Sequence, residues 1–115
     1  MNILFQAQFG EIDVDIYGSY EEPLFKVSDI EFLLSINNIR DIIKNYNSSQ
    51  LCKINSSEQI IYMLTEQGLH KISLNARKNI IEEFQEWIFD VLKEIRLHEK
   101  NKLKLQLKQK NLLLI

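Results

Sequence analysis

The chain has 115 residues, of which 45% are hydrophobic and 26% are charged, and this composition is typical of one folded domain. Its three glycines and one proline exclude a collagen-like or linker-dominated chain, and no apolar run is long enough to span a bilayer. The single Cys52 cannot form an internal disulfide, and the N-terminus lacks the layout of a secretory signal. We therefore expect an intracellular protein that does not contact a membrane.

The net charge is −2, but the charges are distributed unevenly along the chain. Residues 1–31 hold seven acids and one base, and residues 32–81 hold three acids and six bases. Residues 82–99 hold six acids and two bases, and residues 100–115 hold five lysines and no acid. A binding surface depends on local rather than net charge, so the two basic segments are candidates for contact with an acidic partner. Small charge blocks are also common on ordinary surfaces that contact only water. The charge distribution by itself favours this second interpretation.

The first third of the sequence predicts antiparallel sheet. Residues 11–17 alternate strictly between apolar and polar side chains, which is typical of a strand with one face in water. Residues 5–9 alternate in the same way, and Gly10 can turn the chain between the two segments. The pattern predicts a hairpin over residues 3–17, followed by a third short strand at residues 24–27.

The spacing of apolar residues then changes to three and four, which predicts two short helices. Ser28 followed by Glu31 is typical of a capping box and predicts a helix that starts at Ser28. A turn at residues 35–38 separates it from a second helix, whose apolar side extends from Ile39 to Tyr46. The pair resembles a helix-turn-helix outline, which also occurs in many unrelated domains.

Residues 51–54 and 59–64 predict a second hairpin around a polar turn. Thr65 is a good N-cap for a third short helix, in which Gly68 lowers the helix propensity. From about Asn79, apolar residues recur at three- and four-residue steps and predict a long amphipathic helix. The fold class is therefore α+β: a small antiparallel sheet of two hairpins, short helices and a long C-terminal amphipathic helix.

The predicted domain covers residues 1–98, and a basic, leucine-rich tail follows at residues 99–115. Continuing the heptad past Ile95 gives a polar seam that is weak for a coiled coil, and alternate leucines in the tail show a strand period. Either the helix continues with its lysines outward or its last turns fray. The apolar end, Leu112–Ile115, needs a partner, so the tail packs on its own domain or binds another chain, for example in a homodimer.

Nothing in the sequence supports enzyme chemistry. Cys52 falls in a predicted strand, where a thiol usually packs as a small apolar group. His70 and His98 have no further Cys or His at metal-ligand spacing. Asp13 and Asp15 share one strand face, but no further oxygen ligands accompany them, and no glycine-rich phosphate loop is present. We expect no catalytic residue, no metal and no cofactor.

Two stretches of the sequence carry a combination of family motifs. The first is Leu24-Phe25-Lys26-Val27-Ser28-Asp29-Ile30 followed by Leu33-Leu34-Ser35-Ile36-Asn37-Asn38. The second comprises Leu64-Thr65-Glu66-Gln67-Gly68-Leu69-His70-Lys71-Ile72, Ala76-Arg77-Lys78, Phe84-Gln85-Glu86-Trp87-Ile88 and Val91-Leu92-Lys93-Glu94-Ile95-Arg96. In composition, order and spacing these blocks resemble the Bro-N domain, which heads baculovirus BRO proteins and many prophage antirepressors. The resemblance covers roughly residues 5–98.

The sequence departs from the family pattern at four positions. Ser35 replaces the usual glycine, His70 the usual tyrosine, Asn75 the usual serine and Lys93 the usual proline. A lysine at position 93 lets the last helix continue where proline would interrupt or kink it.

The resemblance implies a DNA-binding or transcription-regulatory module of viral or phage origin, commonly tethered to a variable C-terminal domain. The chain is then a stand-alone copy or a fragment of a longer protein. On this hypothesis, basic side chains and one amide side chain near the second and third helices contact the DNA. They bind the edges of its nucleobases and its phosphates. The candidate nucleic-acid contacts are Asn38, Arg40, Lys44, Lys71, Arg77 and Lys78.

Each of these residues also has an ordinary structural interpretation. Arg40 could pair with Asp41 or Glu31, Asn38 suits a turn, and Arg77 could pair with an acid on the long helix. The alternative function belongs to another class, a protein-interaction adaptor. Phage antirepressors can bind a repressor protein instead of DNA, and the acidic first hairpin would then mimic nucleic acid or contact a basic repressor or host protein.

Overall fold

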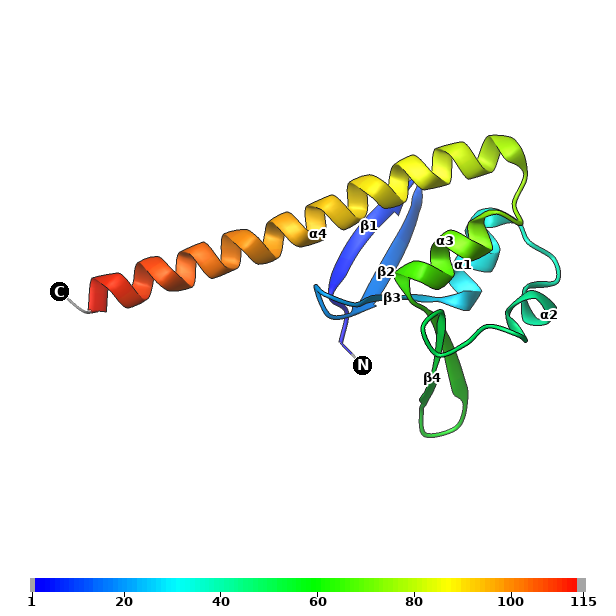
Figure 1. Ribbon diagram of the computed structural model, residues 1–115, viewed down its shortest axis with the longest axis horizontal. Coiled ribbons are helices and arrows are strands. Elements are labelled where there is room, and N and C mark those ends of the chain that lie inside the picture. Colours follow the sequence, from blue (N-terminus) through cyan, green and yellow to red (C-terminus); the bar gives the residue numbers. More distant parts are fainter. Residues whose placement is uncertain (1, 114–115) are drawn as a thin grey trace.

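The computed structural model describes residues 2–113, with side chains for residues 2–102, and its fold is α+β as predicted (Figure 1). Within this range the chain forms one five-stranded antiparallel sheet and four helices. In chain order the elements are β1 (Phe5–Phe9), β2 (Ile12–Gly18), β3 (Pro23–Lys26), α1 (Val27–Leu34), α2 (Ile39–Ile43), β4 (Leu51–Asn55), β5 (Ile60–Leu64), α3 (Glu66–Ser73) and α4 (Lys78–Leu113).

The sheet has the strand order β1-β2-β3-β5-β4. The two predicted hairpins are confirmed as β1–β2 and β4–β5, and each is a directly paired antiparallel unit. The third predicted strand, β3, joins them, because it pairs with β2 on one side and with β5 on the other. It lies one residue earlier than predicted, since Val27 already belongs to the following helix.

One apolar row crosses all five strands and forms the floor of the core. Phe5 lies opposite Ile16, Ile16 opposite Phe25, and Phe25 opposite Leu64, which in turn lies opposite Leu51. The three central members of the row have no exposed surface. Three helices pack their apolar sides onto it, through the buried residues Ile30, Leu34, Leu69, Ile72, Phe84, Ile88 and Ile95. Each such side chain contributes about 1.5–3 kcal/mol on burial.

Helix α1 begins directly at the end of β3, so the predicted capping box at Ser28 is wrong. The helix starts at Val27, with Lys26 in the N-cap position and no side-chain capping hydrogen bond. Lys26 is held in the sheet opposite Met63, and its backbone is extended. The ladder therefore sets the helix start, which leaves the exposed Ser28 inside the first turn.

Helix α2 is shorter than the apolar pattern predicts. It ends at Ile43, and Tyr46 lies beyond it in the following turn, where its N–H bonds to the Ile43 carbonyl at 2.9 Å. Tyr46 is nevertheless half-buried against the core. The turn before α2 begins at Ser35, which adopts the left-handed conformation with φ 53°.

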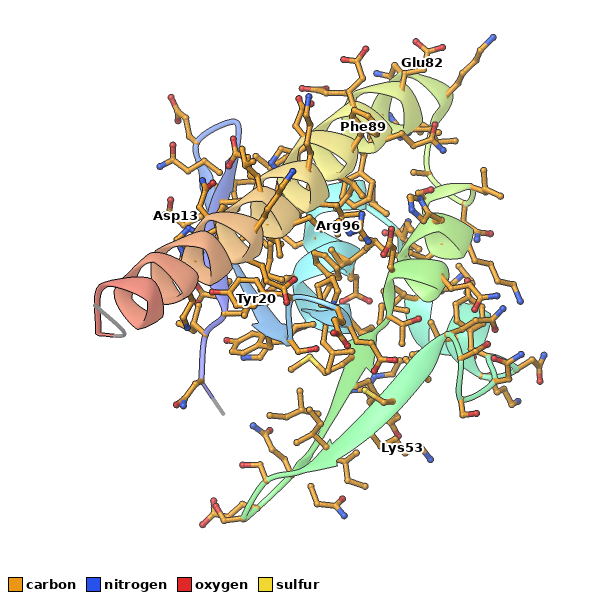
Figure 2. All side chains as sticks on the ribbon, turned by 60° about the vertical axis from the view of Figure 1, so that its left-hand side comes forward. Asp13, Tyr20, Lys53, Glu82, Phe89 and Arg96 are labelled. Carbon is orange, nitrogen blue, oxygen red and sulfur yellow. The ribbon has the colours of Figure 1, made fainter. Side chains whose placement is uncertain are left out.

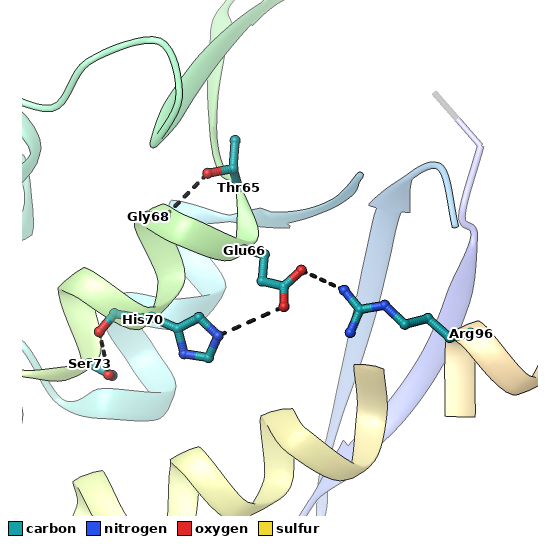
Figure 3. Close-up of polar contacts among 6 residues, drawn as sticks. All are labelled: Thr65, Glu66, Gly68, His70, Ser73 and Arg96. Atoms are coloured by element: carbon teal, nitrogen blue, oxygen red, sulfur yellow. Dashed lines mark hydrogen bonds and ion pairs between the residues drawn. The ribbon is translucent and has the colours of Figure 1, made fainter. Parts of the chain in front are cut away.

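The predicted cap of α3 is confirmed. The Thr65 hydroxyl accepts a hydrogen bond from the Gly68 N–H at 3.1 Å (Figure 3). It also donates one to the Ser49 carbonyl at 2.6 Å. Gly68 is required for a reason that helix propensity does not show. A Cβ at this position would collide with the backbone carbonyl of Gln50, whose oxygen also accepts the Thr65 N–H at 3.0 Å.

The long helix α4 is anchored to the first hairpin by aromatic contacts. The Trp87 indole N–H donates to the Gln8 carbonyl at 2.8 Å, and the Phe9 ring packs edge-on against Trp87 and Phe84. The helix passes through Lys93 without a break and continues to Leu113, so the alternate spacing of the tail leucines does not indicate a strand. The predicted apolar end, Leu112–Ile115, lies outside the residues whose side chains are described. Among residues 2–113, none of the helices has the continuous apolar length that a membrane span requires.

The left-handed conformation of Ser35 predicts that Ser35→Gly stabilises the domain. This conformation costs a residue with a Cβ about 1–2 kcal/mol, and the greater entropy of glycine in the unfolded chain offsets part of the gain. We expect the free energy of unfolding in urea to rise by up to about 1 kcal/mol. Ser28→Gly, at an exposed position within α1, is the control and should lose about 0.5–1 kcal/mol. A loss of stability in Ser35→Gly would contradict the strain argument.

The packing of Gly68 predicts the opposite result for Gly68→Ala. The added methyl has to displace the Gln50 backbone, and overpacking of this kind costs about 1–3 kcal/mol. Urea unfolding should show this loss, although alanine is the better helix former. Gln67→Ala, at the neighbouring exposed position on α3, should stay within about 0.5 kcal/mol of the parent. Equal stability of the Gly68→Ala variant and the parent would show that the close approach is not real.

Candidate nucleic-acid interface

Helix α2 presents two of the predicted contacts on its outer side. Ile39 and Ile43 are buried and hold the helix on the core, so Arg40 and Lys44 lie on its exposed side, one turn apart. Asn38 occupies the N-cap position, but its side chain makes no capping hydrogen bond and is exposed. The amide therefore remains free for an external contact.

The second hairpin adds a base that the sequence analysis did not single out. Lys53 lies directly opposite Tyr62 in the β4–β5 register, and its Nζ is 5.8 Å from the centre of the Tyr62 ring. An ammonium group over an aromatic face is attracted by the ring quadrupole. Lys53 is exposed on the projecting hairpin (Figure 2). The sequence contains this lysine among the six bases of its middle segment, but only the strand register pairs it with an aromatic ring.

Residues from α2, the loop after it and the hairpin enclose one hollow of about 370 Å³, lined by Arg40, Ile43, Lys44, Tyr46, Leu51, Lys53 and Tyr62. Three of these residues are cationic, two are tyrosines and none is acidic. Lys71 of α3 reaches the same place, because its Nζ lies 4.6 Å from the centre of the Tyr46 ring. We call the cationic and tyrosine residues of this region the basic–aromatic surface: Arg40, Lys44, Tyr46, Lys53, Tyr62 and Lys71.

No ion pair neutralises the bases of this surface within residues 2–102. Within residues 2–102 the ion pairs join Glu66 to Arg96 at 2.7 Å and to His70 at 3.9 Å (Figure 3). The alternatives in which Arg40 or Arg77 pairs with an acid are therefore wrong for this part of the chain. The Glu66–Arg96 pair instead ties α3 to α4.

The last two predicted contacts, Arg77 and Lys78, lie at the junction of α3 and α4. The Arg77 carbonyl accepts the N–H groups of Ile80 and Ile81 at 2.9 Å each, and both basic side chains are exposed. No hydrogen bond or ion pair joins them to the basic–aromatic surface in the described part of the chain. The start of α4 lies at the same end of the molecule as α2, opposite to the projecting end of α4 (Figure 1).

Two larger hollows are lined by acidic side chains, in contrast to the basic–aromatic surface. Asp13, Asp90 and Glu94 are among the residues that line a space of about 530 Å³ between β1 and α4. Glu21, Glu22 and Glu66 are among those that line one of about 620 Å³ beside α3. An anionic ligand is repelled from both and attracted to the basic–aromatic surface.

Cys52, Asp13 and Asp15, the other groups considered for chemistry, lie in environments that suit a structural role. Burial, and then the nearby Glu22 carboxylate, raise the pKa of the Cys52 thiol, so the reactive thiolate is disfavoured. Asp13 and Asp15 accept hydrogen bonds from the side-chain amides of Gln8 and Gln6, at 3.0 and 2.7 Å. Residues 2–102 contain no cluster of three or more side chains suited to hold a metal ion.

The Tyr46 hydroxyl is a further feature of the basic–aromatic surface. It is enclosed, lacks a hydrogen-bond partner, and has a pKa raised by burial. Burying an unsatisfied polar group costs about 1–3 kcal/mol.

The enclosed hydroxyl predicts that Tyr46→Phe keeps or raises the stability of the domain. The ring that packs against Lys71 is retained, and only the unpartnered group is removed. Thermal unfolding should show a gain of about 0–1 kcal/mol. Tyr46→Leu is the matched variant that also removes the ring, and it should be clearly less stable. If the phenylalanine variant loses more than about 1 kcal/mol, the hydroxyl makes a bond that stabilises the fold.

Comparison with protein-family models matches residues 13–96 to the N-terminal domain of the BRO family, Bro-N. A search of curated proteins and a search of solved structures each found no match. The matched residues run from β2 into the core-packed half of α4 and include the whole basic–aromatic surface. Because they make up more than two thirds of the chain, the protein belongs to the BRO family and carries its N-terminal domain.

Proposed function

We propose that this domain binds DNA, with the basic–aromatic surface as the centre of the interface. Membership of the BRO family implies a DNA-binding or antirepressor-type regulatory domain. The observation that carries the proposal is the hollow in which Arg40, Lys44 and Lys53 converge without an acid. Phosphate contacts from bases supply most of the affinity of such complexes, so local positive charge matters more than the net charge of −2.

The parts of the surface suit different roles in this interface. Lys44, Lys53 and Lys71 neutralise phosphates, and the Arg40 guanidinium and the Asn38 amide reach for base edges. The β4–β5 hairpin projects from the domain (Figure 1), and a two-stranded ribbon fits the major groove. The tyrosine rings provide an apolar floor and hold the lysine ammonium groups in place.

Arg77 and Lys78 belong to the proposed interface as an outer contact. Both are exposed beside the start of α4, where the free N–H groups of a helix favour an anion. The start of α4 lies at the same end of the molecule as α2 (Figure 1). A duplex that covers the basic–aromatic surface then extends toward them.

The second candidate function is an adaptor that binds a repressor or host protein and no DNA. It is favoured by the acidic hollow between β1 and α4, where Asp13, Asp90 and Glu94 converge, and by the nearby Phe89, which is 68% exposed. A basic protein partner fits such a face. This candidate predicts that the domain leaves duplex DNA unbound at low salt.

The DNA proposal predicts that Arg40→Ala, Lys44→Ala and Lys53→Ala together weaken binding at least tenfold. Fluorescence anisotropy with a labelled mixed-sequence duplex of about 20 base pairs measures the affinity between 50 and 200 mM salt. With about six phosphate contacts, the parent should lose about a thousandfold over this range. The triple variant should keep roughly two thirds of the parent's salt slope, because Lys44→Ala and Lys53→Ala remove two of about six phosphate contacts. Arg77→Ala with Lys78→Ala should reduce the slope by about two.

The matched single controls are Lys53→Ala and Lys93→Ala, which each remove one exposed lysine. Lys53→Ala should weaken binding and Lys93→Ala, on the outer side of α4, should not. Equal effects of the two would show that only net charge matters. An unchanged affinity in the triple variant would place the interface elsewhere, and an absence of any binding at 50 mM salt would favour the adaptor.

A further inference from the structure

The second half of α4 extends beyond the folded core. Within residues 78–102, the last buried residue of the helix is Ile95, and the His98 ring lies 6.0 Å from that of Tyr20 at the edge of the domain. From Lys100 to Leu113 the helix projects past the sheet, over about 21 Å at 1.5 Å per residue (Figure 1). A helical segment shorter than about 12–15 residues is marginal in water by itself.

The charges on α4 fall into two rows of opposite sign. The first half of the helix has acids at four-residue steps, at Glu82, Glu86, Asp90 and Glu94. The second half has lysines at the same steps, at Lys100, Lys104 and Lys108. Four-residue steps put side chains next to one another on a helix, and like charges there repel and destabilise the helix. The acidic row takes no part in the ion pairs of residues 2–102, so its repulsion is not relieved within the described domain.

The outer side of the helix also exposes apolar side chains. Phe89 is 68% exposed and Leu97 is 53% exposed, whereas Phe84, Ile88 and Ile95 are buried against the core. Figure 2 shows Phe89 and Glu82 on this helix, far from Lys53 on the hairpin. The acidic row and the exposed apolar residues therefore lie away from the basic–aromatic surface.

We propose that α4 pairs antiparallel with α4 of a second copy of this chain. In this arrangement the acidic row of each copy lies along the lysine row of the other, and both rows gain partners of opposite charge. A parallel pair would put acid on acid and lysine on lysine. Leu97 lies between the two rows, so the two helices cross near the Leu97 of each copy.

We infer that the partner of α4 is a second copy of the chain, because its projecting lysine segment has the same spacing as the acidic row and the opposite charge. The pairing also covers Phe89 and Leu97 and supports the projecting part of the helix. It leaves the basic–aromatic surface of each copy open, so the inference does not depend on DNA binding.

Light scattering on the purified chain tests the pairing. At 50 mM salt and about 100 µM protein we expect twice the chain mass of 13.7 kDa, and at 500 mM salt at least tenfold weaker association. An acid-reversed variant (Glu86→Lys, Asp90→Lys, Glu94→Lys) and a lysine-reversed variant (Lys100→Glu, Lys104→Glu, Lys108→Glu) should each be monomeric. Their equimolar mixture should form a heterodimer, which also shows that both variants are folded.

Cysteine crosslinking tests the orientation in a Cys52→Ser background. Leu97→Cys should form a disulfide-linked dimer, because the two copies of residue 97 meet at the crossing. Glu86→Cys, an exposed position in the acidic row on the same side of the helix as Leu97, should not, because its copies lie at opposite ends of an antiparallel pair. Efficient crosslinking of Glu86→Cys would overturn the antiparallel arrangement. A monomeric parent at 50 mM salt, or a mixture of the variants that stays monomeric, would overturn the pairing. The acidic row would then be a binding surface for a basic protein instead.

Discussion

The apolar row from Phe5 through Ile16, Phe25 and Leu64 to Leu51 fixes where the helices pack and where the second hairpin lies. It faces the helices at its centre, and the same strand face continues along the β4–β5 hairpin beyond their cover. Exposure rises along this face, from a fully buried Leu64 through a half-buried Tyr62 to Ile60, which is 52% exposed. Because side chains alternate with a period of two, the register that packs Leu51 against the core also places Lys53 beside Tyr62 at the surface. The β4–β5 pairing thus contributes to the core at one end and to the basic–aromatic surface farther along the same face.

The fold separates charges that are nearly balanced along the chain. Bases from α2, the β4–β5 hairpin and α3 converge around the two tyrosines, whereas acids line the groove between β1 and α4. A molecule with a net charge of −2 can therefore present a positive surface, because electrostatic contact with a polyanion depends on the nearest charges. The sign of the net charge excludes neither DNA nor a basic protein as a partner.

Local patterns predicted the elements wherever local chemistry decides them. The strand alternation, the turns of both hairpins, the Thr65 cap and the amphipathic start of α4 were all predicted correctly. The start of α1 was not, because the pairing of β3 with β5 fixes the chain up to Lys26 and overrides the Ser28 capping box. The role of Gly68 was also missed, since the Gln50 backbone that approaches it comes from a different part of the chain.

The fold class, the family resemblance and five bases of the candidate interface follow from the amino-acid sequence alone, because side-chain periodicity and motif order are local properties. Which of these bases lie together follows from the packing of the folded chain. Arg40, Lys44 and Lys71 meet around Tyr46. Lys53 joins them from the β4–β5 hairpin, for which the sequence pattern predicted two strands and no binding residue. Arg77 and Lys78 stay apart at the start of α4. Convergence of residues distant in sequence follows from strand order and helix packing, which no single stretch of the chain encodes.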